Sequence, residues 1–315
     1  MPNREFLYIK TIAEEKSISK AAQKLFLTQP SLSKCVQKIE SSLGTKLFKR
    51  TNTGLILTFA GERYCQIAAD IMKIYNDFEI EVSDINNLKK GKIILGLTRY
   101  LATYLLPVIL PMFKQECPNI SVNIIEENST ELERLLSVGK LDFAIMHTLP
   151  FHEISKHSNI DFYPLSQDPF LIAVKPGHPL GQYAVKYEDL PYPQIDITLL
   201  AKEPFIMVER NQRIRQVTDM IFQKSDIDPT VVLTTKSYET ARRLAFSGIG
   251  ATLVPQLYSQ IFKSANQPDY YCIDKKYSPY WTMCIAIQKN TYISKAAKLF
   301  IRIISEAFGL DALDL

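Results

Sequence analysis

The sequence of 315 residues lacks a segment that is long and apolar enough to cross a membrane. A membrane-spanning helix needs about 18 consecutive apolar residues, and no apolar run reaches that length. The opening stretch MPNREFLYIK also lacks the apolar core and small-residue cleavage site of a signal peptide. We therefore expect a cytoplasmic chain of two or three domains with no membrane partner.

Motifs of metal and redox chemistry are also missing. The five cysteines form no C-x-x-C pair, so they indicate neither a zinc site nor a disulfide framework. We expect them to be small buried residues, although a redox-sensing pair of Cys272 with Cys284 remains an alternative. The histidines at 147, 152 and 157 recur at intervals of five, which do not stack on a helix. The sequence therefore predicts no metal site.

Signatures of catalysis are absent as well. There is no Ser-His-Asp order, no Walker loop and no H-E-x-x-H. Gly248 and Gly250 begin a G-x-G-x-x-G pattern, but Leu253 occupies its last position, so dinucleotide binding is weakly indicated. We predict no catalytic residue and no cofactor.

The charge that is present is unevenly distributed. Residues 1–60 carry ten basic and four acidic residues, a formal charge of +6, whereas the other 255 residues carry 27 basic and 29 acidic ones. A small basic head on a nearly neutral body indicates that the head meets a polyanion.

The basic head has the pattern of a helix bundle. Apolar residues at helical spacing predict a helix over 3–15. Ser17 or Ser19 can cap a second helix. We expect the inward face of that helix to hold Ala21, Ala22, Leu25 and Phe26. After a turn at 27–29, Pro30 begins a third helix at the position where its missing N–H costs nothing.

The third helix leaves polar residues outside its apolar stripe. In a helix-turn-helix, the second of two steeply angled helices enters the major groove. Hydroxyls and N–H groups of its first turn contact phosphate, and Lys34 and Gln37 are long enough to reach base edges. An ordinary solvated helix is the alternative.

A β-hairpin is predicted next, because a turn signal at 51–54 separates two short apolar runs. Its flanking cations Lys49 and Arg50 are placed to touch phosphate, as in the wing of a winged helix-turn-helix. The predicted DNA-binding residues are Ser19, Gln29, Pro30, Ser31, Ser33, Lys34, Gln37, Lys38, Lys49, Arg50 and Thr53.

Three motifs at fixed spacing carry a family resemblance. A-A-x-x-L-x-x-x-Q-P-S-L-S begins at Ala21, I-E-x-x-L-G-x-x-L-F-x-R at Ile39, and L-T-x-A-G at Leu57. Together they resemble the DNA-binding head of the LysR-type transcriptional regulators. Lys34 and Cys35 depart from the Arg or Gln that is more usual there, so the resemblance implies the docking mode and not the operator sequence.

A long helix is predicted between about residues 58 and 90. Its apolar positions are spaced by four and three over three heptads, which is typical of a seam that pairs with a copy of itself. The seam consists of Tyr64, Ala68, Ile71, Tyr75, Phe78, Val82 and Ile85. We predict a homodimer, with packing against the chain's own domain as the alternative.

From Lys92 onward, strand and helix patterns alternate, which predicts a sheet with helices on its faces. Two successive α/β lobes resemble the periplasmic-binding-protein-like effector domain of LysR-type regulators. The fold class is therefore a multidomain α+β chain. Its predicted parts are a winged helix-turn-helix at 1–60, a dimerisation helix at 61–90, effector lobe I at 91–165, lobe II at 166–268 and the return of lobe I at 269–315.

A ligand of such a domain is expected in the crevice at the carboxyl ends of the strands. Hydroxyls, helix N-termini and Arg99 suit a small polar metabolite that bears a carboxylate, although the hydroxyl residues could equally be ordinary helix caps. The predicted effector-binding residues are Thr98, Arg99, Tyr100, Asn128, Ser129, Thr130, His147, Thr148, Glu209, Ser237 and Tyr238.

The resemblance implies a mechanism. Dimers pair through the long helix and again, into tetramers, through effector domains. The heads bind double-stranded DNA, and the metabolite changes DNA bending and contact with RNA polymerase. Two-lobed domains also serve in enzymes and solute receptors. An enzyme should not need the basic head, and a periplasmic receptor would need a signal peptide, so we predict a regulator that is not an enzyme.

Overall fold

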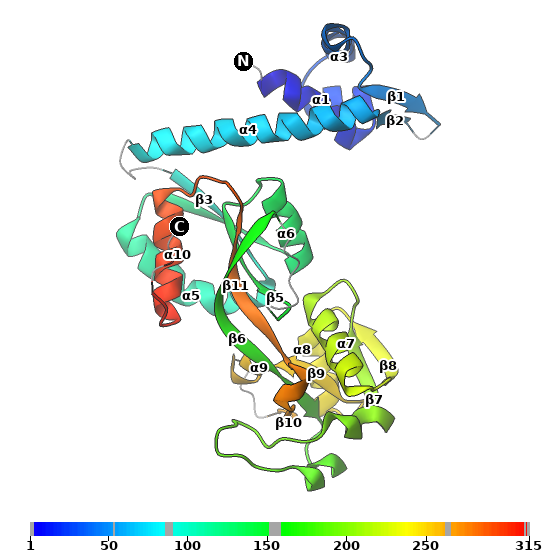
Figure 1. Ribbon diagram of the computed structural model, residues 1–315, viewed down its shortest axis with the longest axis vertical. Coiled ribbons are helices and arrows are strands. Elements are labelled where there is room, and N and C mark those ends of the chain that lie inside the picture. The colour runs from blue at the N-terminus through cyan, green and yellow to red at the C-terminus, as the bar shows by residue number, and fades with distance from the viewer. Residues whose placement is uncertain are drawn as a thin grey trace. The chain divides into compact units, whose positions relative to one another are not determined.

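The computed structural model describes residues 3–52, 54–85, 91–150, 159–261, 266–311 and 313 (Figure 1). The chain divides into two compact units, Met1–Ile85 and Asn86–Leu315. The predicted residue Thr53 and the hinge at 86–90 lie outside the described residues. Within the described part, no helix is long and apolar enough to cross a membrane.

Three short helices open the first unit. Ser17 caps the second helix and Thr28 caps the third, each by accepting a backbone N–H with its hydroxyl. Pro30 lies in the first turn of the third helix, and Gly44 ends that helix with a φ of 66°. The helices are α1 (Asn3–Glu15), α2 (Ile18–Lys24) and α3 (Gln29–Leu43).

A buried carboxylate joins α3 to the hairpin of β1 (Phe48–Thr51) and β2 (Gly54–Leu57). Glu40 accepts a hydrogen bond of 2.9 Å from the N–H of Leu47, and its other oxygen lies 2.7 Å from Nζ of Lys46. Burial alone would raise the pKa of Glu40, but the bonds from Lys46, Leu47 and Phe48 lower it. Glu40 thereby holds the start of the β1–β2 hairpin against α3.

The expectation that Phe26 faces inward is wrong. Its side chain is 96% exposed, and its backbone has a φ of 54°. Because α2 ends at Lys24, Phe26 falls in the turn, where helical spacing no longer decides which way a side chain points.

The long helix α4 (Phe59–Ile85) starts tightly against the head. A Cβ atom on Gly61 would lie 2.1 Å from the carbonyl oxygen of Leu47, so only glycine fits there. Tyr64 packs on Phe6 with ring centroids 5.7 Å apart, and Ala68 is buried. The rest of the described apolar face is exposed: Ile67, Ile71, Ile74, Tyr75, Phe78 and Val82. The start of the seam thus packs on its own head and the remainder does not.

The second unit is built on a sheet with the strand order β10-β6-β11-β5-β3-β4, and β9 also pairs with β6. β3 is parallel to β4 and β5, whereas β11 is antiparallel to β5 and β6. The strands are β3 (Gly91–Leu97), β4 (Ile120–Glu126), β5 (Phe143–Thr148), β6 (Ile160–Val174), β9 (Thr252–Pro255), β10 (Asp269–Cys272) and β11 (Tyr280–Gln288).

Two lobes form along this sheet. In the first lobe, α5 (Arg99–Glu116) and α10 (Lys295–Ala307) pack in one apolar cluster, and α6 (Ser129–Ser137) packs in another. The second lobe adds a parallel pair, and its helices and strands enclose a separate core. Its elements are β7 (Pro204–Val208), α7 (Arg213–Ser225), β8 (Thr230–Thr235), α8 (Tyr238–Phe246) and α9 (Gln256–Ile261).

Strand β6 joins the lobes. Its first part pairs with β11, and its last residues pair with β9 and β10 (Figure 1). Only its last five residues, 170–174, form the uninterrupted apolar run that marks a buried strand in the sequence, yet β6 begins ten residues earlier, at Ile160. Polar and proline residues at 161–169 hid this part, because they interrupt the apolar run that marks a buried strand.

Helix α5 begins at Arg99 and continues through Pro107 and Pro111. Both prolines lie on the exposed face of the helix. The carbonyls that lose their helical N–H partners, those of Thr103 and Pro107, are therefore on the side that faces water. The buried face, with Leu105, stays packed on the sheet.

Candidate functional site

A cavity of about 590 Å³ lies between the two lobes of the second unit. The first lobe contributes the starts of α5 and α6 and the strand ends beside them, and the second lobe contributes the starts of α7 and α8. The lining residues are Thr98, Arg99, Tyr100, Thr103, Glu126, Glu127, Asn128, Ser129, His147, Glu209, Asn211, Gln212, Arg213, Ile214, Lys236, Ser237, Tyr238, Glu239, Tyr258 and Trp281.

Four helix N-termini meet at this pocket. Thr98, Asn128, Gln212 and Ser237 are the N-cap residues of α5, α6, α7 and α8, and all four line it. Asn128 and Ser237 cap their own helices with side-chain hydrogen bonds, whereas Thr98 and Gln212 do not. Unsatisfied N–H groups and the helix dipoles at such positions attract anions.

Three buried side-chain polar atoms lack a hydrogen-bond partner among the described residues: the Tyr100 hydroxyl, Nε2 of His147 and Nε of Arg213. All three residues line the pocket. Buried polar atoms are nearly always paired in native proteins, so each exception asks for an explanation. Their convergence on one cavity indicates that a bound molecule supplies the missing partners.

Aromatic rings form what we call the buried wall of the pocket, made of Tyr100, His147, Tyr258 and Trp281. The ring of Tyr100 stacks on Tyr258 at 4.0 Å, and His147 stacks on Trp281 at 3.8 Å. Each of these residues is no more than 6% exposed. Such a wall suits the apolar body of a small ligand.

A buried carboxylate anchors this wall from behind. Oxygens of Asp168 accept hydrogen bonds of 2.9 Å from Nε1 of Trp281 and from the N–H of Leu257. Burial outweighs these bonds and raises the pKa of Asp168 to about 6. Burial also lowers the pKa of His147 to about 3, so its imidazole is neutral at physiological pH.

An ion pair crosses the pocket between the lobes. The guanidinium of Arg213, on α7, contacts the carboxylate of Glu133, on α6, and also donates to Gln216. Burial raises the pKa of Glu133, and Arg213 opposes that rise. Near the other rim, Nε of Arg99 lies 4.0 Å from a carboxylate oxygen of Glu126, and the Arg99 side chain is 91% exposed.

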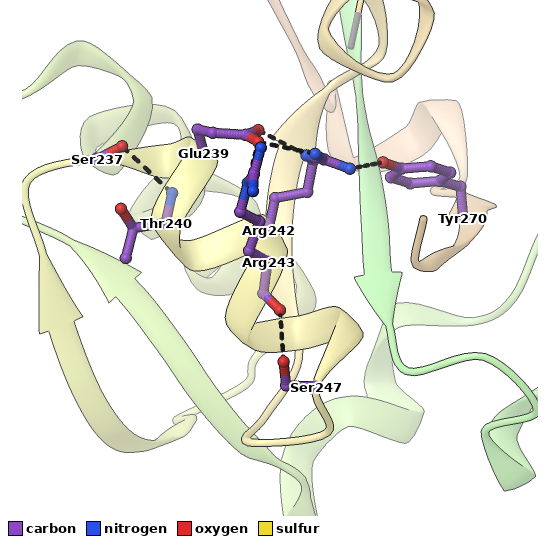
Figure 2. Close-up of polar contacts among 7 residues, drawn as sticks. All are labelled: Ser237, Glu239, Thr240, Arg242, Arg243, Ser247 and Tyr270. Atoms are coloured by element: carbon purple, nitrogen blue, oxygen red, sulfur yellow. Dashed lines mark hydrogen bonds and ion pairs between the residues drawn. The ribbon is translucent and has the colours of Figure 1, made fainter. Parts of the chain in front are cut away.

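On α8, Glu239 lines the pocket but has two arginines of its own helix as partners (Figure 2). Arg242 donates to both carboxylate oxygens at 2.7 and 2.8 Å, and Arg243 donates at 2.7 Å. Burial favours the neutral acid, but these bonds outweigh it and lower the pKa of Glu239. Arg242 also donates to the Tyr270 hydroxyl at 3.3 Å. The carboxylate is thus neutralised beside a helix N-terminus that can attract an anion.

The pocket gathers most of the residues expected from the sequence. Nine of the eleven predicted effector-binding residues line it, and Thr130 and Thr148 do not. Thr130 is exposed in the first turn of α6. Thr148 lies inside β5, where its hydroxyl bonds the carbonyl of Thr282 at 3.4 Å, because that strand runs two residues further than predicted. The sequence missed Arg213, Tyr258 and Trp281, which no local motif marked.

The predicted DNA-binding residues lie on one part of the first unit. Gln29, Pro30, Ser31, Ser33, Lys34, Gln37 and Lys38 belong to α3, and Lys49 and Arg50 to β1. Ser33 is half-buried, and the others, with Ser19 of α2, are exposed. These exposed hydroxyls, amides and cations can contact phosphates and base edges.

The remaining chemistry-bearing residues form no second site in the described part of the chain. Cys272 lies on β10 and Cys284 on β11, and both are free and buried. Burial raises the pKa of both thiols, which disfavours the reactive thiolate. No group of three metal-ligating side chains occurs among the described residues. His152 and His157 lie outside them.

Comparison with known proteins identifies the class. The profile described as "Bacterial regulatory helix-turn-helix protein, lysR family" matches residues 4–62, and "LysR substrate binding domain" matches residues 86–309. The HTH-type transcriptional regulator YcgK of Bacillus subtilis, itself uncharacterised, is 26% identical over 309 residues, which is 95% of this chain and 93% of that protein.

Two solved structures share the fold. Full-length CbnR, complexed with its target DNA, has a TM-score of 0.61 at 18% identity and covers 98% of this chain and 100% of its own. The effector-binding domain of QuiR, in complex with shikimate, has a TM-score of 0.58 at 20% identity and covers 70% and 98%.

The chain belongs to the LysR family. It is a DNA-binding transcriptional regulator with an effector-binding domain, and the predicted family and fold class are confirmed. The family's members bind DNA and small-molecule effectors and form oligomers, and its relatives are regulators rather than enzymes.

Proposed function

We propose that the pocket between the lobes binds a small metabolite that bears a carboxylate, and that this binding controls how the head engages DNA. The observation that carries the proposal is the convergence of three unpartnered buried atoms on a pocket where four helices begin. The carboxylate accepts from the free N–H groups of α5 and α7 and from Nε of Arg213. Coupling requires the ligand to bind two arrangements of the protein with different affinity.

The site residues follow from this proposal. Thr98, Arg99, Asn128, Ser129 and Ser237 bind the carboxylate end. Tyr100, His147, Glu209 and Tyr238 surround the remainder of the ligand. Thr130 and Thr148 are left out because neither lines the pocket.

In the head, the proposal assigns base contacts to Lys34 and Gln37 and phosphate contacts to Ser31, Lys49 and Arg50. Their exposure supports these roles. Two heads on one DNA need two half-sites about one helical turn apart, or a multiple of it. We also propose that the protein contacts RNA polymerase, is located in the cytoplasm and has no catalytic activity.

The dimer is proposed to form through α4, whose apolar face is exposed beyond Ala68. A second pairing through effector domains would make a tetramer, and exposed apolar residues on α5 and β8, among them Val108, Met112 and Val232, support it. For the domains, we propose 1–60, 61–90 and 91–315. Within the last, we propose lobe I at 91–165, lobe II at 166–268 and the return of lobe I at 269–315. Because Ile273 and Tyr277 pack in the second-lobe core, a return later than residue 269 fits the packing better.

The first test is thermal unfolding of the full chain against a panel of amino acids, organic acids, aromatic acids and nucleotides. A ligand at about 100 times its dissociation constant adds roughly 2.7 kcal/mol to the free energy of unfolding. We expect an organic acid to raise the melting temperature of the effector domain. Thr98→Ala and Ser129→Ala should each lower the affinity for that ligand. Unchanged affinity in both variants would contradict the assignment of the pocket.

The dimer is tested separately. Ile74→Glu and Phe78→Glu place charges on the exposed apolar face of α4, where Ile74 is 69% and Phe78 57% exposed. Because these side chains are already exposed in the monomer, replacing them should not unfold the head, while the oligomer should dissociate. Analytical ultracentrifugation measures the result. An unchanged sedimentation profile would reject α4 as the interface.

A further inference from the structure

Two of the three unpartnered atoms belong to uncharged side chains of the buried wall. His147 is 1% exposed and its Nε2 has no partner, and Tyr100 is 4% exposed with an unpartnered hydroxyl. The carboxylate end of the ligand is already assigned to the helix N-termini and Nε of Arg213, which leaves these two atoms without a partner. Each can donate or accept one hydrogen bond once a partner reaches it.

The surroundings of these two atoms reject a charged group. His147 is stacked on Trp281, and Tyr100 is stacked on Tyr258. The nearest carboxylate behind the wall, that of Asp168, is already bonded by Trp281 and Leu257. An ion placed here would lose its hydration without gaining a free counter-charge. An uncharged hydroxyl or carbonyl loses far less and gains the missing hydrogen bonds.

The charged side chains of the pocket lie elsewhere on its lining, and none belongs to the buried wall. Arg99, Arg213 and Lys236 stand beside the helix N-termini. The acidic residues of the lining are Glu126, Glu127, Glu209 and Glu239. The pocket therefore has two kinds of polar environment within one cavity of about 590 Å³. One suits an anion, and the other suits an uncharged polar group.

We propose that His147 and Tyr100 form a specificity subsite for a hydroxyl or carbonyl group, so that the effector is a hydroxy or oxo acid. This rests on the proposed function, because the same ligand binds through its carboxylate at the helix N-termini. A simple acid of the same shape leaves both atoms unpaired. An amino acid of the same shape carries an ammonium group, which aromatic ring faces can attract, so the 4-amino acid is the competing ligand in the test.

Trp281 provides the measurement, since it is the only tryptophan of the chain and its ring lies 3.8 Å from that of His147. A ligand that reaches His147 must contact or displace this ring and so change its emission. The full chain is titrated with cyclohexanecarboxylate and with its 3-hydroxy, 4-hydroxy, 4-oxo and 4-amino derivatives. The parent, hydroxy and amino acids do not absorb at the wavelengths that excite tryptophan, and the weak carbonyl absorption of the oxo acid is corrected by titrating it into free tryptophan.

We expect at least one hydroxy or oxo acid to bind ten-fold or more tightly than the parent acid, because a site built to pair a polar group discriminates strongly against its absence. His147→Phe keeps a ring against Trp281 and removes Nε2, and Tyr100→Phe removes only the hydroxyl. Each should reduce that preference about ten-fold while changing the affinity of the parent acid less than two-fold.

Thr148→Val is the matched control. Thr148 is buried beside His147 on β5 but does not line the pocket. It should leave the preference unchanged.

The outcomes separate the two proposals. If parent and substituted acids bind equally well, or if the amino acid binds best, the subsite is wrong while the carboxylate site stands. If the preference survives in both Phe variants, His147 and Tyr100 do not create it. If no acid changes the emission or the melting temperature at millimolar concentration, the carboxylate site and the subsite fall together.

Discussion

The head and the pocket present their polar groups in opposite ways. In the head, the proposed contacts are exposed and come from α3 and β1, within residues 29–50. In the pocket, the groups that stand out are buried and come from segments as distant as Tyr100 and Trp281. Exposed cations attract any nucleic acid, and this binding weakens as the salt concentration rises. Buried unpaired atoms select one molecular shape, because an imperfect partner leaves them unpaired.

The pocket should therefore depend on buried networks that the surface does not have. Arg242, whose side chain is 2% exposed, bonds Glu239 and Tyr270 (Figure 2). Arg242→Met leaves a partly buried carboxylate and a hydroxyl without this partner and should lower the free energy of unfolding by about 3–5 kcal/mol. Urea unfolding measures the change.

Its control lies one residue further along the same helix. Arg243 bonds the same carboxylate, but its side chain is 73% exposed. Arg243→Met should therefore cost less than about 1 kcal/mol. If both variants lose the same free energy of unfolding, burial does not determine how much each arginine contributes to stability.

The second prediction concerns pH. Burial raises the pKa of Asp168 from its usual 3.8 to about 6. Between these values the folded state holds a proton that the unfolded state has released, so the contribution of Asp168 to stability falls as pH rises from about 4 to 6 and is level above. His147, whose pKa is lowered to about 3, contributes in the opposite direction over the same range, so the Asp168 contribution is the difference between the wild type and Asp168→Asn. The change attributable to this group is about 3 kcal/mol. Unfolding by urea at several pH values measures it.

Trp281 reports the same titration, because its Nε1 donates to Asp168. Its emission should change with a midpoint near pH 6. Asp168→Asn should abolish that midpoint and remove the fall in stability between about pH 4 and 6, which leaves the rise with pH that the buried neutral His147 contributes. A midpoint that persists in this variant would assign the titration to another group.

The head should respond in a different way. Lys34→Ala removes a proposed base contact and should weaken the preferred DNA site by roughly 1–3 kcal/mol while relaxing the choice of base. Binding to a pool of random duplexes, followed by sequencing, measures both effects. An unaltered preference would exclude Lys34 from base recognition.

The smallest effect is expected for Lys49→Ala on the wing. A phosphate contact weakens all DNA sequences alike and lowers the salt slope by about one. Affinity at several salt concentrations measures that slope. A loss confined to one sequence would contradict a phosphate contact at Lys49.

The same contrast explains what the sequence could predict. The head follows from local rules: hydroxyl caps at Ser17 and Thr28, a proline at the start of α3, and a turn before β2. The error at Phe26 arose where the helix stopped and its spacing ceased to apply. Local chemistry therefore decided most of the head.

The pocket was predicted in outline, because loops after strands and starts of helices converge at one edge of such lobes. Its buried wall was predicted only in part. Tyr100 and His147 were expected there, whereas Trp281 reaches His147 only through the pairing of β5 with β11, and Tyr258 comes from α9. The cross-lobe pair of Arg213 with Glu133 likewise joins residues eighty positions apart. No local pattern reports such contacts.

The central claim is that a ligand in the pocket and DNA on the head are coupled. The most direct test measures the dissociation constant of the acid by Trp281 emission, with and without a duplex selected by the head. The account predicts that DNA changes this constant by the same factor by which the acid changes DNA affinity, since coupling is reciprocal. An identical constant with and without DNA would contradict it.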